Sequence, residues 1–341
     1  MTPRTAPADG PRFGLLLPHF GRGATMDSVV QVARDAERYG FSSVWVRDRL
    51  LAAAPHGLLL EAGSTRFFEP LLTLTAVAAV TRTLRLGTAV LTPVRHPVKL
   101  LQDIGTLWAM SQGRLELGVG LGVAADDLAA IGSAGADRKA LFARQMQVLA
   151  DGLTGVEPSP ATDPAARIDP RPDAPVPIWY GGTSVAAVRR AFRHGQGWIA
   201  GRLPIDTFRD RMNLVERLHA ELGRPIRVAT MPITVLAESR AAARARVADA
   251  VAELAASAEG SADWLRPASG SFRTIEDLAG LLIAGGADDC IQQVQNLLAI
   301  GIDEIIFDFR VMFDDIADGV RLLGEGVLPH FSGITAGATA P

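Results

Sequence analysis

The sequence predicts an α/β fold of the (β/α)8 TIM-barrel class, and three observations support this prediction. Eight short apolar runs are separated by segments with helical periodicity. The runs are continuously apolar rather than alternating, which is typical of parallel strands covered on both faces. The length of 341 residues suits one large barrel as well as about two smaller domains. A doubly wound open sheet is the alternative architecture.

The predicted strands are apolar runs of strand length, most of them bounded by proline, glycine or charged residues. They cover residues 13–17, 43–46, 84–91, 115–119, 176–180, 197–200, 226–236 and 304–309. Helical spacing predicts helices at residues 27–39, 70–80, 97–112, 124–131, 140–153, 185–193, 205–222, 239–256, 288–300 and 316–323. Asp27 is the expected cap of the first helix. Pro70 and Pro97 stand where proline is tolerated, at the first position of a helix.

Three long segments lack any period, and we interpret them as insertions after strands two, four and seven. They cover residues 51–68, 155–175 and 259–272. Loops of this length in compact domains tend to be functional. We expect one barrel domain at residues 12–328, an N-terminal tail at 1–11 and a C-terminal tail at 329–341.

The composition indicates a soluble globular protein. Hydrophobic residues make up 48% of the chain, charged residues 21%, and the net charge is -3. This balance gives no reason to expect a nucleic-acid or membrane partner. The single cysteine, Cys290, forms no intrachain disulfide, and no Cys/His spacing predicts a metal site. Because we find no signal peptide and no long apolar run, we expect a cytoplasmic location.

In a barrel, the active site lies at the carboxyl ends of the strands. Gly181, Gly182 and Thr183 follow the fifth strand and precede a helix, an arrangement that can cradle a phosphate. The alternative is a tight turn with a helix cap. Gly120 belongs to a glycine-rich strand end whose spacing does not match a dinucleotide fingerprint. It predicts either a ligand against bare backbone or close packing.

Charged residues end the first two strands. Asp48 can accept a hydrogen bond from a ring N–H, and Arg49 can hold an anion, although an internal ion pair is the alternative. His19 ends the first strand and is a candidate proton donor, although a lone histidine is more often structural. We therefore take His19 and Arg49 as the candidate catalytic residues.

The ordered set of motifs resembles the luciferase-like monooxygenase superfamily over roughly residues 13–309. The segments that carry this resemblance are residues 13–18 (FGLLLP), 36–48 (AERYGFSSVWVRD), 86–91 (LGTAVL), 95–97 (RHP), 111–120 (SQGRLELGVG), 177–182 (PIWYGG) and 197–198 (GW). The resemblance implies a (β/α)8 barrel that binds a reduced flavin or deazaflavin in its mouth. It also implies that such proteins often form homodimers through the helices after strands two and three.

The resemblance assigns roles to particular residues. The cofactor ring is expected on a bulge at Ala89 and Val90, which in many relatives contains a non-prolyl cis peptide. The phosphate is expected at residues 181–183, and Asp48 is expected to face the ring. Two departures stand out: Arg49 replaces a histidine of many relatives, and Val123 replaces a glutamate of the sugar-phosphate dehydrogenases. The second departure argues against alcohol oxidation of that type.

The leading functional hypothesis is an oxygenation of a small organic substrate by O2 and reduced FMN, which a separate flavin reductase could supply. The alternative is hydride transfer from coenzyme F420, whose longer acidic tail would favour added arginines at the rim. The candidates for that rim are Arg49, Arg95, Arg202 and Arg310. Weaker alternatives are a non-catalytic flavin-binding barrel and a nicotinamide dehydrogenase on an open sheet.

The substrate pocket is expected to form from residues 51–68, 123–131 and 259–272. Its candidate lining residues are Phe67, Phe68, Trp264 and Phe272. Aromatic residues in long loops can equally pin the loop to the core.

Overall fold

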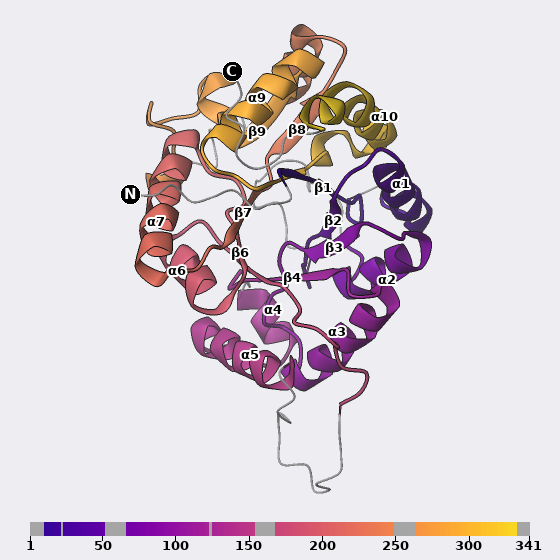
Figure 1. Ribbon diagram of the computed structural model, residues 1–341, viewed down its shortest axis with the longest axis vertical. Coiled ribbons are helices and arrows are strands. Elements are labelled where there is room, and N and C mark those ends of the chain that lie inside the picture. Colours follow the sequence, from indigo (N-terminus) through magenta and orange to yellow (C-terminus); the bar gives the residue numbers. More distant parts are fainter. Residues whose placement is uncertain are drawn as a thin grey trace, which may run out of the picture.

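A closed barrel of parallel strands forms the centre of the molecule (Figure 1). The computed structural model describes residues 10–21, 23–51, 66–122, 125–153, 168–248 and 263–332. Within these ranges eight strands close in the order β1-β10-β7-β6-β5-β4-β3-β2. This confirms the (β/α)8 barrel and excludes the doubly wound open sheet. The hypothesis of a nicotinamide dehydrogenase required that open sheet and is therefore excluded as well.

The barrel strands coincide with the predicted apolar runs. They are β1 (Arg12–Leu16), β2 (Ser43–Val46), β3 (Arg85–Thr88), β4 (Leu115–Val119), β5 (Ile178–Gly181), β6 (Gly197–Ile199), β7 (Arg227–Thr230) and β10 (Glu304–Phe307). Neighbouring strands pair in parallel, so all their carboxyl ends open at one mouth.

The predicted strand at 226–236 was wrong in one respect, because it is two strands. β7 stays in the barrel, whereas β8 (Ile233–Leu236) leaves it and pairs in parallel with β9 (Leu282–Gly285). Pro232 lies between them and has no N–H to continue the barrel ladder. The strand β9 was not predicted.

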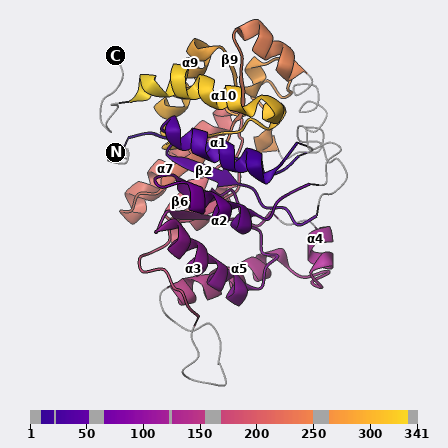
Figure 2. The ribbon, with the colours of Figure 1, turned by 90° about the vertical axis from the view of Figure 1, so that its right-hand side faces the viewer.

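Helices surround the barrel, and α1, α2 and α3 cover one of its sides (Figure 2). Their bounds are α1 (Met26–Arg38), α2 (Pro70–Val80), α3 (Pro97–Ser111), α4 (Ala125–Ala130), α5 (Arg138–Leu153), α6 (Val185–His194), α7 (Ile205–Leu222), α9 (Ala287–Ala299) and α10 (Ile316–Leu322). Residues 240–248 are also helical. The cap of α1 is Thr25, which accepts a hydrogen bond from Ser28 N, and not Asp27 as predicted. Among the described helices, none is both long and apolar enough to cross a bilayer.

The barrel interior is filled with side chains and does not form a pore. Trp45 and Trp179 pack edge to face with ring centroids 5.7 Å apart. Below them, the buried Glu304 accepts hydrogen bonds from Ser43 Oγ (2.5 Å) and Trp45 Nε1 (3.0 Å). Burial, together with the charge of Glu116, raises the pKa of Glu304 to about 7. The centre of the barrel is therefore packed core, and a site is expected at the carboxyl ends of the strands.

Several predictions fall on residues outside the described ranges. These are residues 1–9, 22, 52–65, 123–124, 154–167, 249–262 and 333–341. They include Val123 and about half of the residues expected to form the substrate pocket. Phe331, which we assigned to the C-terminal tail, is buried and packs on Phe13 with ring centroids 5.2 Å apart.

Candidate active site at the barrel mouth

A bulge interrupts the pairing of β3 with β4 at the mouth. At this point the side chain of Thr88 takes the place of backbone-to-backbone hydrogen bonds between the two strands. Its Oγ1 donates to Gly118 O (2.8 Å) and accepts from Gly118 N (2.9 Å). Pairing resumes where Leu91 N donates to Gly118 O (2.8 Å). Between these points, Ala89 and Val90 are joined by a cis peptide. The bulge and the cis geometry are those that the family resemblance implied.

Three glycines let the bulge lie close to its neighbours. A Cβ on Gly120 would lie 2.5 Å from Val90 Cγ2, and a Cβ on Gly181 would lie 2.7 Å from Val90 Cγ1. A Cβ on Gly118 would lie 1.8 Å from the carbonyl oxygen of Thr88. Close packing therefore explains the glycine within β4, the glycine just after it and the glycine that ends β5. It also brings together four predicted cofactor residues, namely Ala89, Val90, Gly120 and Gly181.

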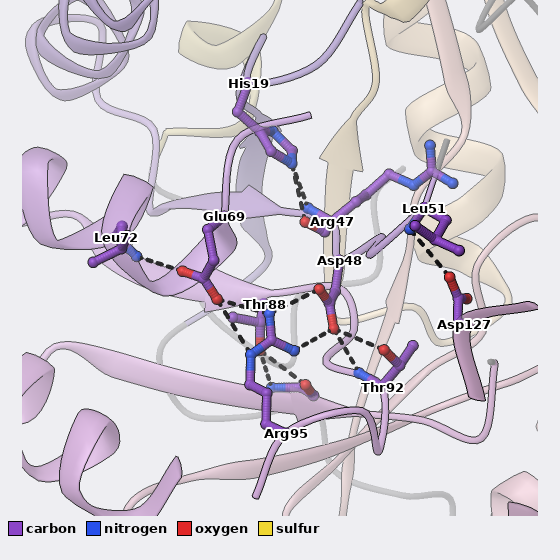
Figure 3. Close-up of polar contacts among 11 residues, drawn as sticks. His19, Arg47, Asp48, Leu51, Glu69, Leu72, Thr88, Thr92, Arg95 and Asp127 are labelled. Carbon is purple, nitrogen blue, oxygen red and sulfur yellow. Dashed lines mark hydrogen bonds and ion pairs between the residues drawn. The ribbon is translucent and has the colours of Figure 1, made fainter. Parts of the chain in front are cut away.

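Asp48 lies in an internal ion pair beside the bulge (Figure 3). Arg95 binds it through two contacts, Nη1–Oδ2 at 2.6 Å and Nη2–Oδ1 at 2.9 Å. Thr92 donates to Oδ2 from both its N–H and its hydroxyl, each at 2.9 Å. The side chain of Asp48 is only 2% exposed. The ion pair considered for Asp48 thus exists, with Arg95 as its partner, and it holds the segment that follows Val90.

Arg95 extends this network to α2. Its Nη2 also donates to Glu69 Oε1 (2.7 Å), and Glu69 Oε2 caps α2 by accepting from Leu72 N (2.8 Å) (Figure 3). Burial opposes the charged form of Arg95. The hydrogen bonds and charges of Asp48 and Glu69 outweigh burial and hold the pKa of Arg95 above its ordinary value. Arg95 was predicted as a rim residue, but it lies within the wall of the mouth.

His19 is fully buried and joins the ends of β1 and β2. Its Nδ1 lies 2.9 Å from Leu17 O, and its Nε2 lies 3.0 Å from both the N–H nitrogen and the carbonyl oxygen of Arg47 (Figure 3). These backbone partners hold the ring in place, and its burial favours the neutral state. Burial lowers the pKa of His19 to about 4, which agrees with that state.

Aromatic side chains form an apolar platform at the mouth. Phe20 stacks on Phe67 (ring centroids 5.2 Å apart) and meets Phe313 edge to face (5.0 Å). Met231 and Val90 belong to the same cluster. Phe67 lies in this cluster, and its predicted place in the lining of the substrate pocket stays a prediction. Phe272, by contrast, is buried in the main core, so it pins its loop as the alternative interpretation held.

Arginines surround the platform on the side of β10. The buried Asp308 accepts from Arg310 Nε (2.8 Å) and pairs with Arg202 Nη1 (3.4 Å). The guanidinium groups of Arg310 and Arg47 lie over the Phe20 ring, at 5.5 Å and 5.3 Å from its centroid. Burial would raise the pKa of Asp308, but these arginines outweigh it and keep the pKa below its ordinary value. Sequence reasoning found Arg202 and Arg310 but missed Asp308 and Arg47, although both end barrel strands.

The turn after β5 has the geometry of a capped tight turn. Gly182 has φ +136°, its N–H donates to Ile199 O (3.1 Å), and Ser184 caps α6. Trp264 Nε1 donates to Thr183 Oγ1 (3.3 Å), which leaves the hydroxyl hydrogen of Thr183 to donate elsewhere. The predicted phosphate cradle at residues 181–183 stays a prediction.

Arg49 follows Asp48 directly and is half-buried. Two residues further on, Leu51 N donates to Asp127 Oδ1 (3.1 Å), which ties the end of β2 to α4 (Figure 3). In the part of the chain that the structure describes, no group of three or more His, Cys, Asp or Glu residues could hold a metal ion.

Comparison with known proteins assigns the family. The model of the family described as luciferase-like monooxygenase matches residues 12–304. The chain belongs to the luciferase-like monooxygenase family. The curated relatives of this family member include an F420-dependent glucose-6-phosphate dehydrogenase from Nakamurella multipartita. It is 35% identical over 188 residues, which cover 52% of this chain and 53% of the relative.

A second F420-dependent glucose-6-phosphate dehydrogenase, from Amycolatopsis mediterranei, is 31% identical over 50% of this chain and 52% of the relative. The chain spans about half the length of these curated relatives.

Solved structures of the luciferase-like family share the fold at low sequence identity. A monooxygenase from Streptomyces bottropensis has a TM-score of 0.73 at 21% identity and covers 94% of this chain and 100% of its own. An F420-dependent secondary alcohol dehydrogenase, solved with an F420-acetone adduct, has a TM-score of 0.73 at 15% identity and covers 94% and 98%. These likenesses support the barrel. The family and its relatives are oxidoreductases that use either a flavin or F420.

Proposed function

We propose that this protein is an F420-dependent oxidoreductase that reduces a small apolar substrate at a carbonyl, imine or alkene. The observation that carries the proposal is the group of Arg47, Arg202 and Arg310 around Asp308, beside an aromatic platform. F420 carries more negative charge than FMN because its tail is longer and acidic. The positive charge of these arginines at the mouth attracts the more acidic cofactor. The curated relatives named for F420 support the same choice.

The mouth fits a planar ring. Val90 is half-buried there and packs against the buried cluster of Phe20 and Met231. A Cβ on Gly122 or Gly201 would meet nothing within 4 Å, so backbone borders open space at both positions. We assign the ring to Ala89, Val90 and Gly120, and the phosphate to the turn at residues 181–183. Asp48 acts indirectly in this proposal, by holding Thr92 and Arg95.

When bound, reduced F420 would supply a hydride, and the substrate would take up that hydride together with one proton that comes from the solvent. Phe20, Phe67 and Phe313 exclude water from the reacting atoms. We propose that Arg49 stabilises negative charge as it develops on the substrate oxygen. His19 has a positioning role because its ring is neutral and both nitrogens face backbone groups.

The sequence argues against oxidation of a sugar phosphate, the reaction for which the curated relatives are named. Arg49 stands where many family members have a histidine, and Val123 stands where the sugar-phosphate dehydrogenases have a glutamate. Without these two groups the chain lacks the acid and base of that reaction.

The second candidate is oxygenation by reduced FMN and O2, with a separate reductase as the source of reduced flavin. The aromatic platform favours it, because oxygenation requires a mouth that excludes water. Calorimetric titration of the apoprotein with F420 and with FMN separates the two. We expect tight binding of F420 and little binding of FMN, and the reverse result would replace the first candidate by the second.

The hypothesis of a non-catalytic cofactor-binding barrel is tested with protein that has been loaded with reduced F420. We expect substrate-dependent loss of reduced F420 with at least one member of a panel of carbonyl, imine and enone compounds. Binding without turnover across the panel would favour the non-catalytic binding protein.

We also propose that the protein forms a homodimer and that it is located in the cytoplasm.

A further inference from the structure

A second basic site lies outside the mouth, in a groove between α6 and α7. These helices pack side by side on the outside of the barrel (Figure 1). The groove has a volume of about 310 Å³, and the residues that line it are Val185, Arg189, Asp210, Arg211, Asn213, Leu214 and Arg217.

The groove concentrates positive charge. Three arginines, Arg189, Arg211 and Arg217, face one carboxylate, Asp210. Within the described ranges, no carboxylate forms an ion pair with any of these three guanidinium groups. Arg209 lies on the same helix but outside the groove, and it pairs with Asp206 at 3.0 Å. Several guanidinium groups gathered in one concave surface favour an anionic ligand.

The groove begins at the turn that we assign to the cofactor phosphate. Arg211 Nε donates to the carbonyl oxygen of Thr183 (3.2 Å), so one groove residue contacts that turn directly. Along α7, the distance from Arg211 to Arg217 is about 9 Å at 1.5 Å per residue. A surface of this length suits a flexible chain with more than one carboxylate better than it suits a single phosphate.

We propose that the groove between α6 and α7 binds the acidic tail of F420, a chain of linked carboxylates, as it leaves the phosphate at residues 181–183. This inference rests on the proposed function and deepens it, because it names the part of the cofactor that discriminates F420 from FMN. FMN ends at its phosphate and does not reach Arg189 or Arg217.

The test compares two forms of F420 that share the ring and phosphate but differ in the tail. One form carries no glutamate and the other carries several. Isothermal titration of the wild type should give a dissociation constant about three- to tenfold lower for the long form, since exposed ion pairs contribute modestly. In the double variant Arg189→Gln/Arg217→Gln this difference should disappear, while the affinity for the short form stays unchanged. Arg209→Gln is the matched control and should retain the difference.

Salt gives an independent readout. In 0.5 M NaCl the preference of the wild type for the long form should fall towards onefold, because exposed charges are screened. Equal affinity of the wild type for both forms would overturn the groove assignment and leave the proposed function intact. A preference that survives in the double variant would also overturn it. Failure of both forms to bind would refute the proposed function, and the groove assignment with it.

Discussion

At the scale of single residues, Asp48 supports the mouth rather than lining it. Its carboxylate is almost completely buried between Arg95 and Thr92. We expect Asp48→Asn to lower the free energy of unfolding by about 2–4 kcal/mol, because it leaves a buried guanidinium with one partner fewer. Urea denaturation measures the change. The matched control is Asp206→Asn, which breaks an exposed pair and should cost less than about 1 kcal/mol. An Asp48→Asn variant as stable as this control would contradict the structural role of Asp48.

His19 makes stability depend on pH. Its pKa is about 4 in the folded protein and about 6.5 in the unfolded chain. As pH falls from 6.5 to 4, His19 becomes protonated in the unfolded chain but stays neutral in the folded protein. The free energy of unfolding therefore falls in that window, by up to about 3 kcal/mol. Above pH 6.5 the group has no effect.

Unfolding free energies at pH 7 and pH 4.5 measure this dependence. The difference between the two should shrink in His19→Gln and stay as in the wild type in His96→Gln, since His96 is exposed. If His19→Gln keeps the full wild-type difference, His19 is not the group responsible.

At the scale of elements, the bulge after β3 depends on glycines in β4 and β5. Gly120→Ala would place a Cβ 2.5 Å from Val90 Cγ2 and displace Val90, against which we place the cofactor ring. We expect cofactor affinity to fall by about tenfold or more, the size of a modest overpacking cost. Adding Val90→Ala should restore part of the affinity, because the two side chains are in direct contact.

Gly122→Ala is the control for the bulge, since its Cβ meets nothing within 4 Å. Cofactor titration measures all three variants. Equal losses in Gly120→Ala and Gly122→Ala would show that contact with Val90 is not the cause.

The helix α2 carries the predicted homodimer interface. Its sequence is apolar on all faces, and Leu72 is 72% exposed. An apolar face of this kind on a surface helix favours a protein partner. We expect Leu72→Glu to shift the protein from dimer to monomer in light scattering, whereas Leu222→Glu, on the exposed end of α7, leaves the dimer intact. A wild type that is monomeric at micromolar concentration would refute the interface.

At the scale of the whole molecule, the sequence predicted the barrel better than it predicted the site. Continuous apolar runs mark parallel strands directly, which is why the eight barrel strands were found. The strand at 226–236 was misjudged because Pro232 lies within an apolar run whose two halves belong to different sheets.

Site residues were harder to predict because their partners are far away in the chain. Asp48 and Arg95 are 47 residues apart, and no local pattern couples them. Asp308 is a single acidic residue at a strand end, and only the closed barrel brings it near Arg202. By contrast, the family motif alone was enough to locate the bulge at Ala89 and Val90.

The central claim is that the mouth holds a deazaflavin ring on the bulge after β3, with the phosphate at the turn that follows β5. A crystal structure of the protein with F420 tests it most directly. We predict ring density against Val90 and Gly120, and phosphate density at residues 181–183. Ring density anywhere else, or a mouth that stays empty at saturating F420, would contradict the account.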